Sequence, residues 1–83
     1  MTDLRDLVER YLVLVEGGPP SNFSAWSPDL PGCVASGASV PETEREMRGA
    51  IALHLEGLLA DGEAPPEPSG PGVYVQRQAS SAA

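Results

Sequence analysis

Hydrophobic and polar residues follow a period of two in the first part of the chain. Tyr11, Val13 and Val15 are apolar, and the two leucines between them are apolar as well. A period of two is typical of a β-strand, so this pattern predicts a strand over 10–16 with apolar side chains on both faces. We expect such a strand in the middle of a sheet, with a helix on one face. On the other face we expect a subunit partner or the N-terminal segment.

Two further strands are predicted within residues 23–37, on either side of a rigid corner. The run Phe-Ser-Ala-Trp-Ser at its start alternates in the same way and places Phe23 and Trp26 on opposite faces. The corner contains two prolines, which lack backbone donors and so cannot continue a central ladder, and Gly32, which permits a tight reversal. Small apolar residues begin the third strand at Cys33, and this strand can pair back on the second.

A long amphipathic helix is predicted from its capping signals. Ser39 is the expected N-cap and Glu42 stands three residues later, which is the reciprocal arrangement of a capping box. The helix is expected to end near Ala60, because Gly62 suits the left-handed conformation that follows many helices. The apolar face is predicted from spacings of three and four. Its members are Thr43, Met47, Ala50, Ile51, His54 and Leu58.

Shorter elements are predicted towards the two ends. Residues 1–9 suit a short amphipathic helix capped by Thr2. A proline-rich loop over 63–72 is expected to return to the sheet, where residues 73–75 alternate as a last strand.

The resulting fold class is α+β, with the order helix, three strands, helix, strand. We expect a three-stranded antiparallel sheet plus a further strand, with one long helix packed on one face. The predicted organisation is an N-terminal helical extension over 1–9, one domain over 10–77 and a disordered tail over 78–83.

The charge and the cysteine content narrow the range of possible functions. The 83 residues carry a formal net charge of −7, with no lysine, which argues against direct contact with nucleic-acid phosphates and suits a basic protein partner. The charge could also serve solubility alone. A single cysteine excludes an internal disulfide and a multi-cysteine zinc site. Since no signal peptide or membrane-spanning apolar run is visible, we expect a cytoplasmic protein.

The residues that could carry chemistry do not form a convincing set. His54 is the single histidine and lies within the apolar face of the long helix, where a packed histidine is the simpler interpretation. Cys33 with His54 could form a nucleophile and base, but Cys33 is better explained as a small buried apolar residue. Glu16 and Asp29 lack the further carboxylates that a metal-dependent nuclease needs. We therefore predict no catalytic residue, no bound metal and no cofactor.

Several motifs, taken in order, resemble the HicB family of bacterial antitoxins. They are Tyr-Leu-Val-Leu-Val-Glu at 11–16, Phe-Ser-Ala-Trp-Ser-Pro-Asp-Leu-Pro-Gly-Cys at 23–33, the capped helix with Ala50-Ile51 and His54-Leu55-Glu56, and Pro-Glu-Pro-Ser at 66–69. The resemblance covers about residues 11 to 76, and its specificity comes from the motifs jointly.

This resemblance implies a partial ribonuclease-H-like fold that lacks the nuclease carboxylates. It also implies a binding role, in which the chain sequesters a small basic mRNA-cleaving toxin of the HicA type and assembles as a dimer or higher oligomer. Many relatives carry a C-terminal DNA-binding domain. Because this chain ends a few residues after its last predicted strand, we expect no direct nucleic-acid binding by it.

Three hypotheses follow for the function. The first is an antitoxin-type binding module, the second an orphan homo-oligomeric scaffold or regulator without a toxin, and the third a hydrolase using Cys33 and His54. For a subunit interface we consider the leucines that flank the long helix or the outer face of the first strand. The candidate interface residues are Trp26, Asp29, Leu30, Leu53 and Leu59.

Overall fold

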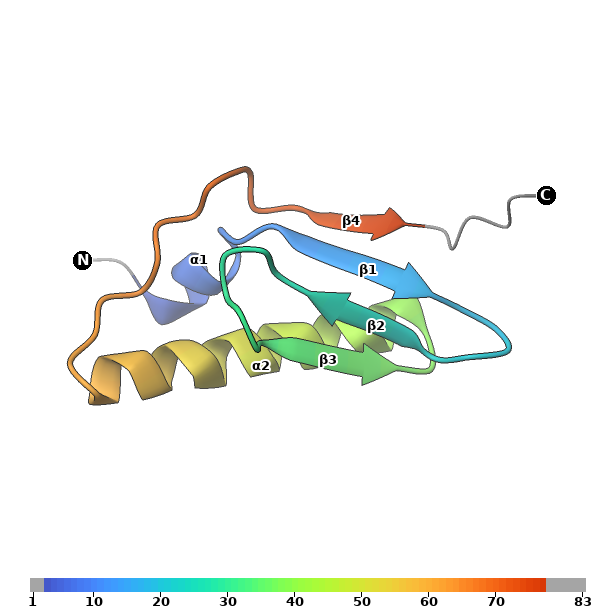
Figure 1. Ribbon diagram of the computed structural model, residues 1–83, viewed down its shortest axis with the longest axis horizontal. Coiled ribbons are helices and arrows are strands. Elements are labelled where there is room, and N and C mark those ends of the chain that lie inside the picture. The colour runs from blue at the N-terminus through green and yellow to red at the C-terminus, as the bar shows by residue number, and fades with distance from the viewer. Residues whose placement is uncertain (1–2, 78–83) are drawn as a thin grey trace.

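The computed structural model describes residues 3–77, which fold into an α+β structure with a sheet on one side and helices on the other (Figure 1). This confirms the predicted fold class and the predicted order of elements. The elements are α1 (Leu4–Val8), β1 (Val13–Gly17), β2 (Phe23–Trp26), β3 (Val34–Gly37), α2 (Val40–Ala60) and β4 (Tyr74–Arg77).

The four strands form one sheet in the order β3-β2-β1-β4. The β1–β2 and β2–β3 pairs are antiparallel, whereas β4 adds to the free edge of β1 in the parallel direction. A parallel neighbour requires a crossover, which α2 and the proline-rich loop provide. The prediction that the first strand is central is therefore confirmed.

The core lies between the sheet and α2. Val13 and Val15 of β1 are fully buried, and they meet a stripe on α2 whose members recur every four residues. The buried members of α2 are Thr43, Met47, Ile51 and Leu55. Fully burying an aliphatic side chain contributes about 1.5–3 kcal/mol. The predicted helix face was partly wrong: Leu55 was omitted, while Ala50 and His54 are only half-buried at its edge.

Both ends of α2 lie where they were predicted, but the capping box forms only in part. The Ser39 hydroxyl accepts a hydrogen bond from the Glu42 N–H at 3.2 Å. The Glu42 carboxylate reaches back one residue beyond the cap and accepts from the Ala38 N–H at 2.8 Å. After the helix, Gly62 adopts a φ of 77°, which is the left-handed stop.

Several element boundaries differ from the predictions by one to three residues. The N-cap of α1 is Asp3, whose side chain accepts from the Arg5 N–H, whereas Thr2 lies outside the described residues. The Cys33 N–H donates to the Leu30 carbonyl at 3.0 Å, so Cys33 still belongs to the corner and β3 starts one residue later. The tail predicted over 78–83 also lies outside the described residues.

The N-terminal helix does not cover the outer face of the sheet. It packs against α2 and contributes Val8 to the core, so both helices occupy the same side (Figure 1). Of the two occupants that the sequence suggested for the outer face of β1, the N-terminal segment is therefore excluded. Within residues 3–77, no other helix or strand lies over that face.

Candidate protein-binding surfaces

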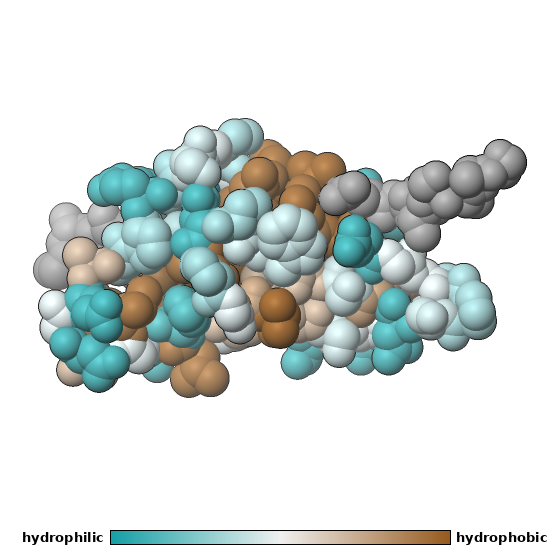
Figure 2. Space-filling view, in the orientation of Figure 1, coloured by the Kyte–Doolittle hydropathy of each residue, from teal (hydrophilic) through white to brown (hydrophobic). Residues whose placement is uncertain are grey.

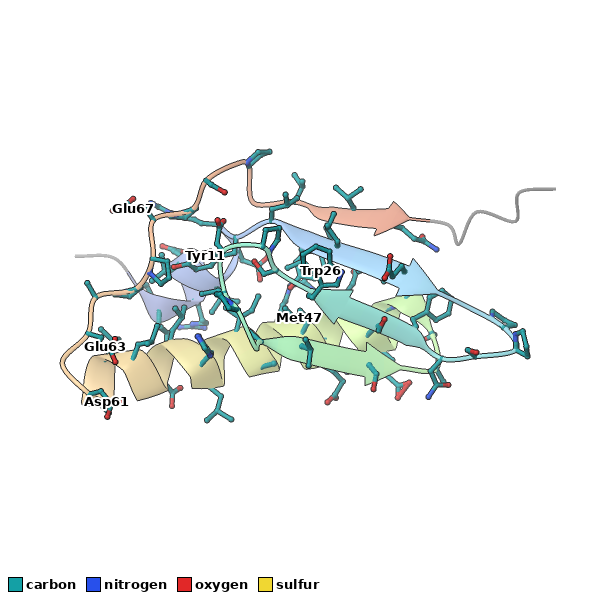
Figure 3. The ribbon with its side chains drawn as sticks, in the orientation of Figure 1. Tyr11, Trp26, Met47, Asp61, Glu63 and Glu67 are labelled. Carbon is teal, nitrogen blue, oxygen red and sulfur yellow. The ribbon has the colours of Figure 1, made fainter. Side chains whose placement is uncertain are left out.

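Apolar side chains cross the whole outer face of the sheet in one row. Val34, Trp26, Leu14 and Val75 occupy directly opposed positions on β3, β2, β1 and β4. Val34 is 65% exposed and Val75 41%, while Trp26 and Leu14 are half-buried. Figure 2 shows apolar residues gathered on this face over β1 and β4, and Figure 3 places Trp26 beside them on β2. We refer to these four residues as the open-face row.

The next row of the same face is polar. Glu16, Ser24 and Ser36 are opposed to one another on β1, β2 and β3. Cross-strand neighbours lie within about 4.5–5.5 Å of one another, so like side chains form continuous bands across a sheet. The outer face thus has an exposed apolar row with a polar row on one side of it, and an exposed apolar surface of this kind is a candidate for protein binding.

A second surface lies where α2 ends and the proline-rich loop begins. Leu59 is 53% exposed on the last turn of α2, and the exposed carboxylates of Asp61, Glu63 and Glu67 follow along the loop (Figure 3). We refer to these four residues as the acidic end. Beside it, a groove of about 360 Å³ separates α1 from the loop. Its lining is Leu4, Leu7, Arg10, Leu59, Pro65, Pro66, Glu67 and Pro68.

The proline-rich loop is fixed by side chains from the first half of the chain. The Tyr11 hydroxyl donates to the Pro66 carbonyl at 2.6 Å. The Asp29 carboxylate accepts from the Ser69 N–H at 3.0 Å and from the Ser69 hydroxyl at 2.6 Å. These hydrogen bonds stabilise the ionised form and lower the pKa of Asp29. The Pro-Asp corner and the Pro-x-Pro-Ser segment, which are separate motifs in sequence, therefore form one structural unit.

A further contact joins both helices to β4. The Arg48 guanidinium lies 4.5 Å from the centre of the Tyr74 ring, and its Nε lies 2.8 Å from a Glu9 carboxylate oxygen. Among residues 3–77, the buried Tyr74 hydroxyl has no hydrogen-bond partner, and burial raises the pKa of Tyr74 to about 12.

The predicted interface residues fall in different places. Trp26 belongs to the open-face row and Leu59 to the acidic end. Leu53 is 71% exposed and borders a shallow hollow that also contains Val34. Asp29 is engaged by Ser69, as described above.

Leu30 does not lie on the surface. It is 1% exposed, because the corner turns its side chain into the core. It is therefore not available to a partner in this structure. The sequence alone did not single out Val34 and Val75, since their neighbours across the sheet depend on strand register.

The geometry gives no support to a hydrolase that uses Cys33 and His54. Both residues border one shallow hollow, but Cys33 is buried and burial raises the pKa of its thiol. A protonated thiol is a weak nucleophile. Within the described chain, no three histidine, cysteine or acidic side chains are grouped so that they could hold a metal ion. No helix among residues 3–77 combines the length and the apolar character needed to cross a membrane.

Comparison with known proteins gives one family and one relative. A family model described as HicB_like antitoxin of bacterial toxin-antitoxin system matches residues 11–81. An uncharacterized 14.9 kDa protein from the rep-hol intergenic region of Haemophilus phage HP1 (strain HP1c1) is 34% identical over 50 residues, which is 60% of this chain. The match spans 38% of the length of the phage protein. No solved structure matches, so the ribonuclease-H-like relationship stays a prediction.

Proposed function

Because this chain belongs to the HicB-like antitoxin family, we propose that it binds and neutralises a small basic mRNA-cleaving toxin of the HicA type. The observation that carries the proposal is the family match, which extends over both the Pro-Asp corner and the Pro-x-Pro-Ser segment. The family indicates an antitoxin role, and thereby a toxin as the kind of partner. Since the substrate of such a toxin is mRNA, we propose that the two proteins meet in the cytoplasm.

We propose the acidic end as the surface that receives the toxin. Leu59 supplies an exposed apolar anchor next to a groove, and Asp61, Glu63 and Glu67 surround it with negative charge. An apolar centre with a charged rim is the usual anatomy of a specific interface. Complementary charge accelerates the encounter and excludes acidic partners.

The distribution of charge supports this choice. Of the twelve acidic residues, all except Glu16 and Asp29 belong to α1, α2, their caps or the loop after α2. A basic protein is therefore attracted towards the helical side and its end rather than towards the open face of the sheet. Leu59 lies within that attractive region.

Co-expression with the product of an adjacent gene for a small basic protein tests the proposal. We expect the toxin alone to arrest growth, the pair to restore it and the two proteins to purify as a complex. Failure of both rescue and complex formation would contradict the proposal.

Two variants test which surface binds the toxin. Leu59→Lys places a positive charge against the basic partner and is expected to abolish rescue. Val34→Lys makes the same change in charge on the open face, at a residue of similar exposure, and is expected to retain rescue. The reverse pattern would place the toxin on the sheet face instead.

The alternative is an orphan homo-oligomeric scaffold or regulator. The open-face row favours it, because an uncovered apolar band suits self-association whether or not a toxin exists. A genomic neighbourhood without a short basic reading frame would support this alternative.

A further inference from the structure

We propose that α1 completes the toxin site, because it forms one wall of the groove beside the acidic end. In this proposal Leu4, Leu7 and Leu59 enclose one apolar side chain of the toxin, and a basic residue next to that side chain meets the carboxylates at the end of α2. The inference rests on the proposed function and goes beyond it by giving the N-terminal residues a part in recognition.

The two walls of the groove come from opposite ends of the described chain. Leu4 and Leu7 of α1 form one wall, and Pro65, Pro66 and Pro68 of the loop after α2 form the other (Figure 1). Both leucines are half-buried, because one side of each packs against the core. The rest of their surface is therefore available to a ligand in the groove.

Contacts outside the groove hold both walls in place. Val8 of α1 is buried in the core, and Glu9, directly after α1, is bonded to Arg48 of α2. The opposite wall is bonded to the start of the sheet through Tyr11 and Pro66. Walls that are already ordered lose little conformational entropy when a ligand enters, so the groove is prepared for binding.

The size and lining of the groove indicate what it accepts. Six of the eight lining residues are leucine or proline. The volume of about 360 Å³ lies at the low end of the range of ligand sites, about 300–1,000 Å³, so the groove has room for about one or two side chains and not for a helix. A single apolar anchor in a pocket is a common centre of a protein interface.

The charges around the groove place the basic neighbour of that anchor. The one basic lining residue is Arg10, which also borders a second hollow with Gly70 and Gly72, towards β4. Arg10 repels a second cation at that end of the groove. Asp61 and Glu63 are exposed just after Leu59 in the chain, so the cation of the toxin is expected beside them.

The family match does not assign this role to α1. It begins at residue 11, so Leu4 and Leu7 lie outside the matched residues, whereas the loop wall lies within them. The contribution of α1 is thus inferred from the groove alone.

Toxin binding by full-length variants tests the wall that α1 forms. Leu4→Ala is expected to raise the dissociation constant of the toxin complex about five- to tenfold, mainly through faster dissociation. The association rate at low salt should stay the same, because the carboxylates are kept. Leu53→Ala removes the same atoms from an exposed residue of α2 outside the groove, and should leave the dissociation constant unchanged. Circular dichroism checks that both variants are folded.

NMR of the wild-type full chain tests the ligand class without a toxin and without a variant. The capped dipeptide N-acetyl-leucyl-arginine amide is expected to shift the methyl signals of Leu4, Leu7 and Leu59, with a dissociation constant of about 1–10 mM. Two matched dipeptides are expected to bind at least about threefold more weakly. N-acetyl-leucyl-glutamate amide reverses the charge, and N-acetyl-glycyl-arginine amide lacks the apolar side chain.

Three results would overturn the inference. They are a toxin complex that folded Leu4→Ala does not weaken, methyl shifts that miss the three leucines, and equal binding of all three dipeptides. The first would leave the proposed function intact. If the chain binds no toxin but the leucyl-arginine probe selectively shifts the three leucines, the proposed function fails, while the groove is supported as a site for an apolar side chain beside a cation.

Discussion

Asp29 connects two parts of the chain through one carboxylate. It accepts both hydrogen bonds that Ser69 can donate to it, across a separation of 40 residues. Because these bonds favour the ionised form, the pKa of Asp29 is lower in the folded protein than in the unfolded chain. The stabilisation is therefore present above the unfolded pKa and is lost as the pH falls through the folded pKa.

Asp29→Asn is expected to lower the midpoint of thermal unfolding at neutral pH. Ser69→Ala is expected to do the same, since either change removes the charge-assisted bond between the two side chains. The double variant should be little less stable than either single one, because both single changes remove one shared interaction. Additive losses would contradict this coupling.

Acid titration distinguishes the contribution of the ionised Asp29 carboxylate to stability from the contribution of packing. The unfolding midpoint of wild-type protein should fall as the pH drops below about 4, in part because Asp29 becomes protonated. Asp29→Asn should show a smaller drop over the same range. An equal drop in both proteins would show that Asp29 contributes little to the acid sensitivity.

The two tyrosine hydroxyls offer a matched comparison. Tyr11→Phe removes a hydrogen bond to Pro66 and is expected to cost about 1 kcal/mol of unfolding free energy. Tyr74→Phe removes a buried hydroxyl that has no partner in the described part of the chain, and is expected to leave stability unchanged or raise it by up to about 1 kcal/mol. Urea denaturation at neutral pH measures both. A loss of similar size in Tyr74→Phe would indicate a partner for its hydroxyl in solution.

Alkaline pH gives an independent check on Tyr74. Its pKa is raised from 10.0 to about 12 by burial, so the folded state holds this proton more tightly than the unfolded chain does. The corresponding stability is present below pH 10 and is lost as the pH rises towards about 12. Tyr74→Phe should therefore lose less stability than wild-type protein over that interval.

At the scale of elements, the sequence correctly predicted the features that depend on residues close together in the chain. The caps of α2 were correct because Ser39, Glu42 and Gly62 act within one turn of the helix ends. The buried stripe of α2 was only partly correct, because Leu55, four residues after Ile51, was left out of the predicted face. The membership of the open-face row depends on strand register. Register is set by two paired strands together, so it cannot be predicted from one segment alone. Leu30 was predicted on the surface, but the corner turns its side chain into the core.

The start of β4 depends on a close approach between backbones. A Cβ atom at Gly72 would overlap the Glu9 carbonyl and lie 2.6 Å from the Arg10 Cα, whereas one at Gly70 would meet nothing within 4 Å. Gly72→Ala is therefore expected to destabilise the protein by about 1–3 kcal/mol, because backbone must move to admit the methyl group. Gly70→Ala should change stability much less.

Urea denaturation compares the two glycine variants, and hydrogen exchange at β4 shows where the effect arises. We expect faster exchange of β4 amides in Gly72→Ala, with α2 much less affected. Equal stability of the two variants would mean that the loop shifts to admit the methyl group at no cost.

For the whole molecule, the main feature is the separation of charge from apolar surface. The carboxylates lie mostly with the helices and the loop after α2, and the exposed row on the sheet is uncharged. The sequence indicated an acidic protein with a basic partner, but it could not show this separation. This separation places an acidic surface and an uncharged apolar surface on different sides of one small domain.

Local charge at the acidic end should control the rate of toxin binding. Asp61→Asn, Glu63→Gln and Glu67→Gln together are expected to slow association about tenfold at low salt, because steering depends on charge near the docking site. The effect should disappear near 1 M salt, where the Debye length is about 3 Å. Stopped-flow mixing with the basic toxin measures the rate.

The control neutralises three exposed acidic residues elsewhere: Asp6→Asn, Glu46→Gln and Glu56→Gln. This control changes the net charge equally, so it should slow association less. Equal slowing by both sets would mean that total charge, rather than the acidic end, attracts the toxin.

The parallel pairing of β4 with β1 has a consequence for synthesis. Val13 pairs with Tyr74, so the central strand receives its second neighbour from the opposite end of the described chain. While the polypeptide is still emerging from the ribosome, β1 retains an unpaired edge until residues 74–77 have been released. Contacts between such distant segments form slowly, and exposed edges invite pairing with other chains. The sheet is therefore completed only after residues 74–77 have left the ribosome.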